Sequence, residues 1–402
     1  MIVSTAKLVI DLGNSETRVK TLYGKTARGN TRSKLTRLDN RYSIIPEEKI
    51  SNYLENSDYT DENSVIFKVD NGLCYCSGDL CNIEFAQTSF RPSALEKKYN
   101  STVTKLSIIN AIRQGIEDVS LFSNCDVESI DVDWEISVLL PPEDLDLGAR
   151  QLADVVKSIT SVDFIMPCVK KNVRIKKVSI FPEGMCAFFG VLFERKGVVR
   201  EGYKYLIDNN ESTVIFDIGA GTTDIVLVKG SQVVQSSRFT KEVGGNNIHR
   251  LVQRSLRNKG IPLPDEVVRE GVNTGYVRSG SRVVDISEDI AGAKRAVSNQ
   301  LVDAVQEFFE SSMISIRTIA NILVCGGGAE ESENDKITPI SNYITEYMKR
   351  LSPDLKLIEM PKVNINGEIK RMSPRLLNIT GAGILCLLYT SPSPRDRSVS
   401  RM

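Results

Sequence analysis

Histidine is almost absent from this sequence of 402 residues, which contains a single one, His249. A metal centre built on imidazoles needs several histidines, and a Ser-His-Asp triad needs one beside two further groups. A lone histidine therefore gives little support to either kind of site. Its neighbours form an apolar stripe typical of a helix, and we expect His249 to lie on the outer face of that helix.

An excess of charge of one sign is lacking as well, since Lys plus Arg and Asp plus Glu number 51 each. No overall field favours nucleic acid or an anionic membrane, so we expect any link to DNA to run through another protein. Long apolar runs are also missing. Asp11 ends the first run after a few residues, which argues against a signal peptide or a membrane span there, and we expect no membrane contact.

Clustered cysteines are also lacking. The chain has eight cysteines, and they lie singly except for Cys74, Cys76 and Cys81. Eight in a chain of this length form no disulfide framework, and these three lack the paired Cys-x-x-Cys spacing of a zinc site. We interpret them as strand cysteines and expect a reducing, cytoplasmic location.

What the chain does have is apolar material, 41% of its residues, which is enough for two or three ordinary domains. Runs rich in β-branched residues, such as 7–13 and 321–328, alternate with helical patterns at 104–119, 148–159 and 246–260. Strands that alternate with helices predict an α/β fold with mixed sheets.

Two stretches repeat one pattern: LVIDLGNSETRVK from Leu8 and VIFDIGAGTTDIVLV from Val214. Each has an apolar run, an aspartate, a glycine and a small polar turn before a second strand, which suggests two related lobes. Turn glycines let backbone amides approach an anion such as phosphate. The candidate phosphate-binding residues are Gly13, Asn14, Ser15, Gly219, Gly221, Thr222 and Thr223.

An aspartate at the tip of each first strand, Asp11 and Asp217, would repel phosphate unless a cation lay between them. Hydrated magnesium is the cation that suits this role. The second stretch is no dinucleotide fingerprint, because Asp224 stands where G-x-G-x-x-G has its third glycine, and the chain has no P-loop. For one hairpin alone, a glycine-rich turn without a ligand is an equal alternative.

These residues resemble the actin, Hsp70 and sugar-kinase ATPase superfamily, and within it the ParM/StbA type of plasmid and phage segregation. The two hairpins are similar to its phosphate hairpins, FPEGMCAFFG (181–190) and LLNITGAGIL (376–385) to its connecting helices, and NILVCGGGAE (321–330) to its adenosine segment. The resemblance implies a two-lobed actin-like (ribonuclease H-like) fold with duplicated mixed β-sheet subdomains around a nucleotide cleft. We expect one lobe at 1–180, with 366–385 returning to it, and the other at 181–365.

The resemblance also implies residue roles. Asp11 and Asp217 would orient magnesium through water, and Arg18 stands where the family often has a lysine that reaches the phosphates. Glu183 would position the attacking water; its alternative is a helix N-terminal glutamate. The nucleoside would lie against Gly326, Gly327 and Gly328, with Gly244 and Gly245 in a nearby turn. Lys294 and Ser298, beside Arg295, match an adenosine segment only partly, and helix surface is their alternative.

The function implied is a polymerising ATPase, with GTP as an alternative nucleotide, that forms dynamic filaments to segregate or position plasmid or phage DNA through a ParR-like adaptor. ATP, ADP and Mg²⁺ are the expected cofactors, and further copies of the chain the expected partner. The alternative is a member of the superfamily that does not polymerise and acts as a small-molecule kinase or a nucleotide-dependent regulator.

The last residues, 386–402, resemble a translated sequencing adapter. The codons TGT CTC TTA TAC ACA TCT encode Cys386 to Ser391 and match a transposase end used in library preparation. A natural disordered tail rich in Pro, Ser and Arg is the alternative. We leave this segment out of the expected fold.

Overall fold

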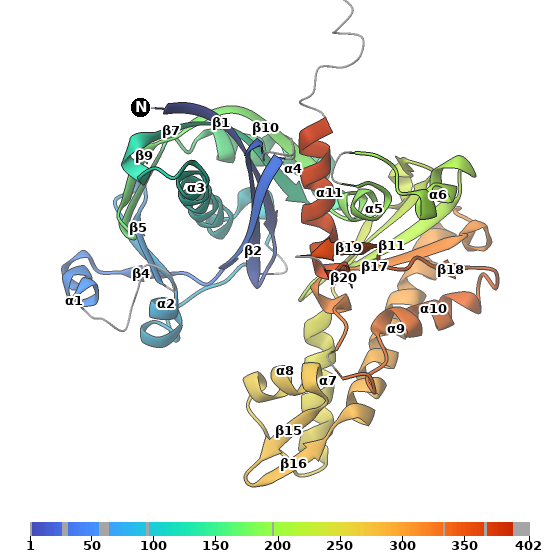
Figure 1. Ribbon diagram of the computed structural model, residues 1–402. Coiled ribbons are helices and arrows are strands. Elements are labelled where there is room, and N and C mark those ends of the chain that lie inside the picture. The colour runs from blue at the N-terminus through green and yellow to red at the C-terminus, as the bar shows by residue number, and fades with distance from the viewer. Residues whose placement is uncertain are drawn as a thin grey trace, which may run out of the picture. The chain divides into compact units, whose positions relative to one another are not determined.

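A computed structural model describes residues 2–25, 31–55, 64–93, 96–194, 197–332, 334–365 and 368–388. The chain divides into two compact units, of which the first comprises Met1–Leu140, Asp144–Pro182 and Leu385–Met402 and the second Pro141–Glu143 and Glu183–Ile384. Most of the tail expected to be an adapter, residues 389–402, lies outside the described residues. Each unit is built on one principal sheet (Figure 1).

The principal sheet of the first unit has the strand order β10-β7-β1-β2-β3. The pair β1–β2 is an antiparallel hairpin, and β7 runs parallel to both β1 and β10. The strands are β1 (Ile2–Leu12), β2 (Glu16–Lys25), β3 (Thr31–Asp39), β7 (Ile130–Leu140) and β10 (Arg174–Pro182).

The second unit repeats this topology in the order β13-β12-β11-β17-β18, with β14 also paired to β12. Here β11–β12 is the antiparallel hairpin, and β17 runs parallel to β11 and β18. The shared order confirms the duplicated mixed sheets expected from the sequence. The strands are β11 (Ser212–Ile218), β12 (Thr223–Lys229), β13 (Gln232–Val233), β14 (Phe239–Lys241), β17 (Asn321–Cys325) and β18 (Lys356–Leu357).

The first unit also holds a smaller sheet, in the order β4-β6-β5-β8-β9. Helix α3 lies among the strands of this unit (Figure 1) and is buried along most of its length, because its apolar residues join those of both sheets in one core. The elements are β4 (Ser43–Ile45), β5 (Ser64–Lys68), β6 (Cys74–Gly78), β8 (Ser161–Met166), β9 (Val169–Asn172), α1 (Ile50–Leu54), α2 (Asp79–Glu84), α3 (Thr102–Ser123) and α4 (Leu145–Lys157).

Helices and two hairpins complete the second unit, whose apolar residues form two clusters around its sheet. The elements are α5 (Met185–Leu192), α6 (Tyr205–Asp208), α7 (Gly245–Asn258), α8 (Asp265–Thr274), α9 (Ser287–Ser311), α10 (Ile340–Lys349), α11 (Leu377–Leu388) and the hairpins β15 (Tyr276–Ser279) with β16 (Arg282–Asp285) and β19 (Lys362–Ile365) with β20 (Glu368–Arg371). Short 3-10 helices include η8 (Gly327–Ala329) and η9 (Pro374–Leu376).

The structure assigns most of α11 differently from the sequence-based expectation, since residues 366–384 fall in the second unit and not the first. The reason is a close helix crossing. A Cβ on Gly190 in α5 would lie 2.6 Å from the carbonyl oxygen of Leu377, and one on Gly381 in α11 would overlap the carbonyl oxygen of Cys186. Only glycine at both positions allows this approach of the two backbones.

We predict that Gly381→Ala destabilises the protein by about 1–3 kcal/mol, because the added methyl group must push α5 and α11 apart. Gly292→Ala is the control, since this exposed glycine of α9 has open space around its missing Cβ. Alanine there should stabilise the helix by roughly 0.5–1 kcal/mol. Chemical unfolding followed by circular dichroism measures both; equal effects would contradict the crossing.

Candidate functional site

The two hairpins that the sequence singles out are closed in the same way. The backbone N–H of Gly13 donates to the carbonyl of Glu16 at 3.1 Å, and that of Gly219 donates to the carbonyl of Thr222 at 2.8 Å. A Cβ on Gly13 would lie 2.6 Å from the Glu16 oxygen, and one on Gly219 3.1 Å from the Thr222 oxygen. A Cβ would therefore clash in the first turn and be tightly packed in the second, and each turn leaves a two-residue loop.

Both loops present backbone N–H groups that the rest of the described chain does not use. Among the described residues we find no hydrogen-bond acceptor for the amides of Asn14 and Ser15 in the first loop, or of Ala220, Gly221 and Thr222 in the second. Successive free amides of a tight turn form a concavity suited to an anion.

A buried carboxylate lies two residues before each glycine. Asp11 is 5% exposed and pairs in register with Arg18, and Asp217 is 6% exposed and pairs in register with Asp224. The same register in both hairpins therefore places a cation opposite the first aspartate and a second carboxylate opposite the other. We call each hairpin, together with the side chains that contact its loop, a half-site. The two half-sites have the same backbone arrangement but differ in charge.

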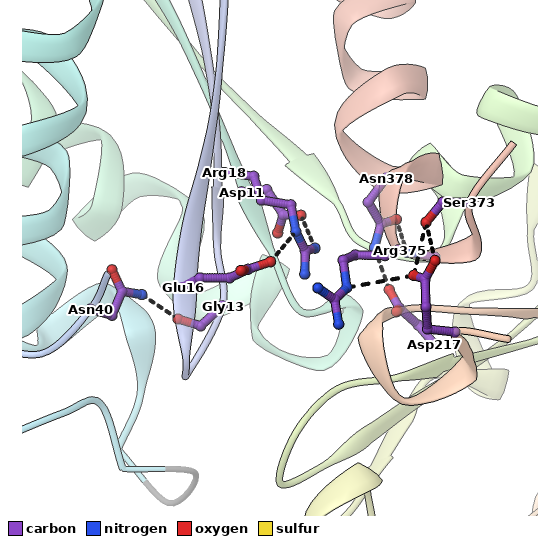
Figure 2. A network of polar contacts seen from close by, with 11 residues as sticks. Asp11, Gly13, Glu16, Arg18, Asn40, Asp217, Ser373, Arg375 and Asn378 are labelled. Carbon is purple, nitrogen blue, oxygen red and sulfur yellow. Dashed lines mark hydrogen bonds and ion pairs between the residues drawn. The ribbon is translucent and has the colours of Figure 1, made fainter. Parts of the chain in front are cut away.

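Arg18 binds both carboxylates beside it in the first unit (Figure 2). Its Nη1 lies 3.0 Å from Asp11 Oδ2 and its Nε lies 2.9 Å from Glu16 Oε1. Burial alone would lower the pKa of Arg18, but the charges of Asp11 and Glu16 outweigh burial and raise it. The guanidinium therefore stays charged and neutralises the carboxylates next to the first loop.

Asn40, which the sequence did not single out, fixes the shape of the first loop. Its Nδ2 donates to the carbonyl of Gly13 (Figure 2), and its backbone N–H donates to the carbonyl of Ser15 at 3.4 Å. Its Oδ1 accepts from the hydroxyls of Thr17 at 2.7 Å and Ser107 at 3.1 Å. Since Ser107 belongs to α3, Asn40 ties the loop to the central helix of the unit.

In the second unit, the start of α7 packs against the hairpin loop. The N–H of Gly245 donates to the carbonyl of Gly219 at 2.9 Å, and that of Asn246 donates to the carbonyl of Ala220 at 2.7 Å. A Cβ on Gly244 would lie 2.7 Å from the Gly219 oxygen. Gly244 is thus required for this close approach, and Gly245, whose Cβ would lie 3.3 Å from Gly328 Cα, packs beside it.

Thr223 has a different use from the donor role expected of it. Its side chain is fully buried, and its hydroxyl donates to the carbonyl of Val243 at 2.6 Å. This bond anchors the segment before α7 to the hairpin. Thr222, which closes the loop, is then the threonine left to act as a donor.

The three glycines that follow β17 reach the same loop from the other side. Gly326 has a φ of 88°, and its N–H donates to the carbonyl of Pro374 at 3.2 Å. A Cβ on Gly328 would lie 2.5 Å from Ile218 Cγ2, and Gly328 Cα is 3.3 Å from the position of a Cβ on Gly245. Gly327 begins η8 between them. The structure therefore brings the hairpin, the start of α7 and the triple glycine together.

The carboxyl group of Asp217 is held by Asn378 of α11, whose Nδ2 donates to Asp217 Oδ2 (Figure 2). The Oδ1 of Asn378 accepts from the N–H of Gly184 at 3.0 Å, next to Glu183, which is 7% exposed. Burial raises the pKa of the Cys325 thiol well above its usual range, and Asp217, Asp224 and Glu183 raise it further. These three carboxylates therefore lie near one thiol.

Lys294 and Ser298 are buried and do not lie on the helix surface, which the sequence analysis gave as the alternative to an adenosine-binding role. Lys294 is 5% exposed, and its Nζ donates to the carbonyl of Thr338 at 3.0 Å; burial lowers its pKa to about 8, with Glu331 opposing the shift. Ser298 is fully buried, and its hydroxyl has no partner in the described part of the chain. The guanidinium of Arg295 stacks on Tyr343 at 5.7 Å.

His249 was expected on the outer face of a helix, and this was wrong. Helix α8 packs on α7, so that His249 is partly buried near Asp265 and Arg269. Burial lowers the pKa of His249 to about 4, the charge of Arg269 lowers it further, and Asp265 acts in the opposite direction. The imidazole is therefore neutral at pH 7.

Comparisons with known proteins establish the fold. The family model "Archaeal actin homologue MreB-like, C-terminal" matches residues 215–335, which include the second hairpin and the triple glycine. The actin-like protein MamK of Magnetospirillum gryphiswaldense is 24% identical over 161 residues, a segment that covers 34% of this chain and 45% of that relative. The match thus spans less than half the length of MamK.

Solved structures match over nearly the whole chain. The actin-like protein Alp7A has a TM-score of 0.70 at 14% identity and covers 100% of both chains. The Bacillus thuringiensis ParM with ATP has a TM-score of 0.63 at 15% identity, covering 96% of this chain and 99% of that one. A 15-stranded ParM filament from Clostridium botulinum has a TM-score of 0.61 at 18% identity, with the same coverage. The chain has an actin-like fold.

Helices that could cross a membrane are absent from the described residues, since none combines the required length with sufficient apolar character.

We predict that Asn40→Ala lowers the free energy of unfolding by about 2–3 kcal/mol, because the Gly13 carbonyl and the buried hydroxyls of Thr17 and Ser107 each lose a partner. Asn209→Ala is the control, since the side chain of this exposed asparagine donates to the nearby Glu211 at 3.3 Å; its effect should stay within about 0.5 kcal/mol. Urea unfolding measures both. Equal losses in the two variants would show that Asn40 does not hold the loop.

We predict that His249 makes the protein less stable as the pH falls below about 6.5. The unfolded chain takes up a proton there, whereas the folded imidazole does so only near pH 4. With allowance for partial exposure, the loss between pH 7.5 and pH 5 is about 1–2 kcal/mol. His249→Gln should show a shallower decline in urea unfolding over this range; parallel curves for the two proteins would contradict the buried imidazole.

Proposed function

We propose that this chain is a magnesium-dependent ATPase that assembles into filaments. The observation that carries the proposal is the pair of matched hairpins, each with a turn glycine, free loop amides and a buried aspartate two residues earlier. A single hairpin of this kind is an ordinary turn, but two with the same register suit the two ends of a polyphosphate.

The residues present fit a magnesium nucleotide. Free amides of the loops suit phosphate oxygens. Arg18 offsets the charge of Asp11, whereas Asp217, with Asp224 opposite it, would repel phosphate unless a cation lay beside it. Carboxylate oxygens acting through water are the ligands that magnesium takes in such sites. Bound there, magnesium would neutralise charge that develops on the phosphates.

Within this proposal, Gly13, Asn14 and Ser15 and the loop of Gly219, Gly221 and Thr222 hold the β- and γ-phosphates. Arg18 supplies a positive charge beside the first loop, in the place of the family's lysine. Glu183 accepts a hydrogen bond from the attacking water and orients it toward the γ-phosphate. Its low exposure and the restrained turn at Gly184 support a fixed orientation.

The nucleoside would lie against the triple glycine, which has no side chains to block a planar ring. Gly244 and Gly245 shape the same region. The buried hydroxyl of Ser298, which has no partner in the described chain, and the ammonium of Lys294 would bind polar atoms of the nucleoside. GTP is accepted in place of ATP if these groups do not distinguish the two bases.

Filament formation is supported by the actin-like fold and by the ParM filament among its structural matches. Head-to-tail contacts between copies do not close on themselves and give filaments. With a balanced overall charge, DNA is bound indirectly, through a ParR-like adaptor, and the filament segregates or positions plasmid or phage DNA in the cytoplasm.

We predict that Mg²⁺ and ATP raise the light scattering and the pelleted fraction of the protein, that scattering decays as phosphate is released, and that ADP has little effect. Asp217→Ala should abolish the rise, since the cation loses its carboxylate. Glu183→Gln should still assemble but release phosphate about 100-fold or more slowly, because the water loses its acceptor.

The control is Glu346→Gln, at an exposed glutamate on α10 that forms a surface ion pair with Arg350; it should behave as the unmodified protein. ATP turnover without assembly, at concentrations well above those at which related filaments form, would contradict the filament and favour a small-molecule kinase or a regulator. Absence of both nucleotide binding and turnover would contradict the ATPase itself.

A further inference from the structure

The segment 373–378, which comprises Ser373, η9 and the first residues of α11, contacts the functional groups of the second half-site at several points. Pro374 accepts the N–H of Gly326 at 3.2 Å. The hydroxyl of Ser373 donates to both carboxylate oxygens of Glu330 at 2.9 and 2.8 Å, and Arg375 Nε lies 3.5 Å from Glu330 Oε2. The segment is thus fastened to both ends of the triple glycine.

Asn378 continues this set of contacts and uses both ends of its amide. It is 6% exposed; its Nδ2 donates to the carboxylate of Asp217, and its Oδ1 accepts the N–H of Gly184. The two partners, Asp217 and Gly184, lie far apart in sequence. Asp217 is the proposed magnesium aspartate, and Gly184 directly follows Glu183, the proposed water-positioning residue. One side chain therefore links the aspartate of the hairpin with the turn that carries the glutamate.

The charge around Asp217 shows why the linking group is a neutral amide. Asp224 lies opposite it in register and Glu183 lies near the same buried thiol. A further carboxylate here would repel Asp217, and an apolar residue would remove both the donor to Asp217 and the acceptor for the Gly184 amide. Asparagine offers a donor to the carboxylate and an acceptor to the amide without adding charge.

The bond from Asn378 restrains the backbone at Gly184, which is a flexible position. Its φ is 69°, a conformation that only glycine adopts without strain, and a Cβ there would lie 3.1 Å from Val226 Cγ1. The backbone of a glycine in a turn has more freedom than that of other residues, and the bond to Asn378 removes it. The direction of the neighbouring Glu183 side chain follows from that of this peptide.

We propose that Asn378 is the positioning residue of the second half-site, which holds Asp217 and the Glu183–Gly184 turn in one fixed relation. The inference rests on the proposed ATPase function and extends it to a residue outside both hairpins. In this proposal Asn378 acts through Asp217 and Gly184. Since it belongs to α11, a displacement of this helix would alter both groups at once.

The test is Asn378→Asp, which keeps the size of the side chain and its acceptor for Gly184 but replaces the donor with a carboxylate. Two carboxylates within hydrogen-bond distance share one proton, so the pKa of the pair is raised above that of the unfolded chain. The lost contact is then restored as the pair takes up a proton at lower pH.

The first readout is the melting temperature of the nucleotide-free protein. A raised pKa in the folded state means that the stability of the variant relative to the unmodified protein is lowest at pH 8 and recovers toward pH 5.5. Asn342→Asp is the matched control, because Asn342 is exposed on α10 and its difference from the unmodified protein should not change over this range.

The second readout is ATP turnover. We expect kcat of Asn378→Asp to be at least tenfold below that of the unmodified protein at pH 8 and the gap to narrow at pH 6, with KM for ATP changed less than threefold. If the single variant does not fold, Asp217→Asn combined with Asn378→Asp exchanges amide and carboxylate. This double variant should fold, with a melting-temperature difference independent of pH.

The outcomes separate the inference from the function on which it rests. A melting-temperature difference that is the same at pH 8 and pH 5.5 overturns the pairing, and a pH-dependent one with kcat unchanged overturns the positioning role; in both cases the unmodified protein still hydrolyses ATP. An unmodified protein that neither binds nor hydrolyses ATP overturns the proposed function, and the positioning role with it.

Discussion

The structure depends on a conflict between two chemical groups at the same place: a loop of unpaired backbone amides, which attracts an anion, and a buried carboxylate two residues away, which repels one. Both hairpins contain these two groups, at Asp11 with Gly13 and at Asp217 with Gly219. Arg18 offsets the charge of Asp11, whereas Asp224 lies opposite Asp217 and adds to its charge. Under the proposed function, the phosphates of a nucleotide supply the anion for the loop amides, and magnesium supplies positive charge beside the aspartate. A simple anion would bring no such positive charge, and for this reason we propose a magnesium nucleotide.

Each unit supports its hairpin with a buried asparagine, although the two act on different groups. Asn40 bonds the carbonyl of the turn glycine and connects it to α3, whereas Asn378 bonds the aspartate and connects it to the turn at Gly184. In the first half-site Arg18 lies opposite Asp11 and neutralises it. In the second, Asp224 lies opposite Asp217, and the neutral amide of Asn378 binds Asp217 instead. The difference in charge between the hairpins thus explains the difference in their support.

The sequence predicted those parts of the site that depend on local chain chemistry. Glycine and aspartate at fixed spacing between apolar runs identify both hairpins, and the strand and helix patterns predict the duplicated mixed sheets that the structural matches confirm. Asn40 and Asn378 escaped detection because their partners lie 27 and 161 residues away. His249 and α11 were misplaced for a related reason: the covering helix α8 and the glycine crossing with α5 are tertiary contacts that periodicity does not encode.

The measurement that tests the central claim most directly is calorimetric binding of ATP, AMP and adenosine, each with magnesium and with a chelator. If both hairpins hold the β- and γ-phosphates around a hydrated cation, ATP with magnesium binds at least 100-fold more tightly than AMP, and the chelator removes most of that advantage. Equal affinity for ATP and AMP, or affinity that does not depend on magnesium, would contradict the account.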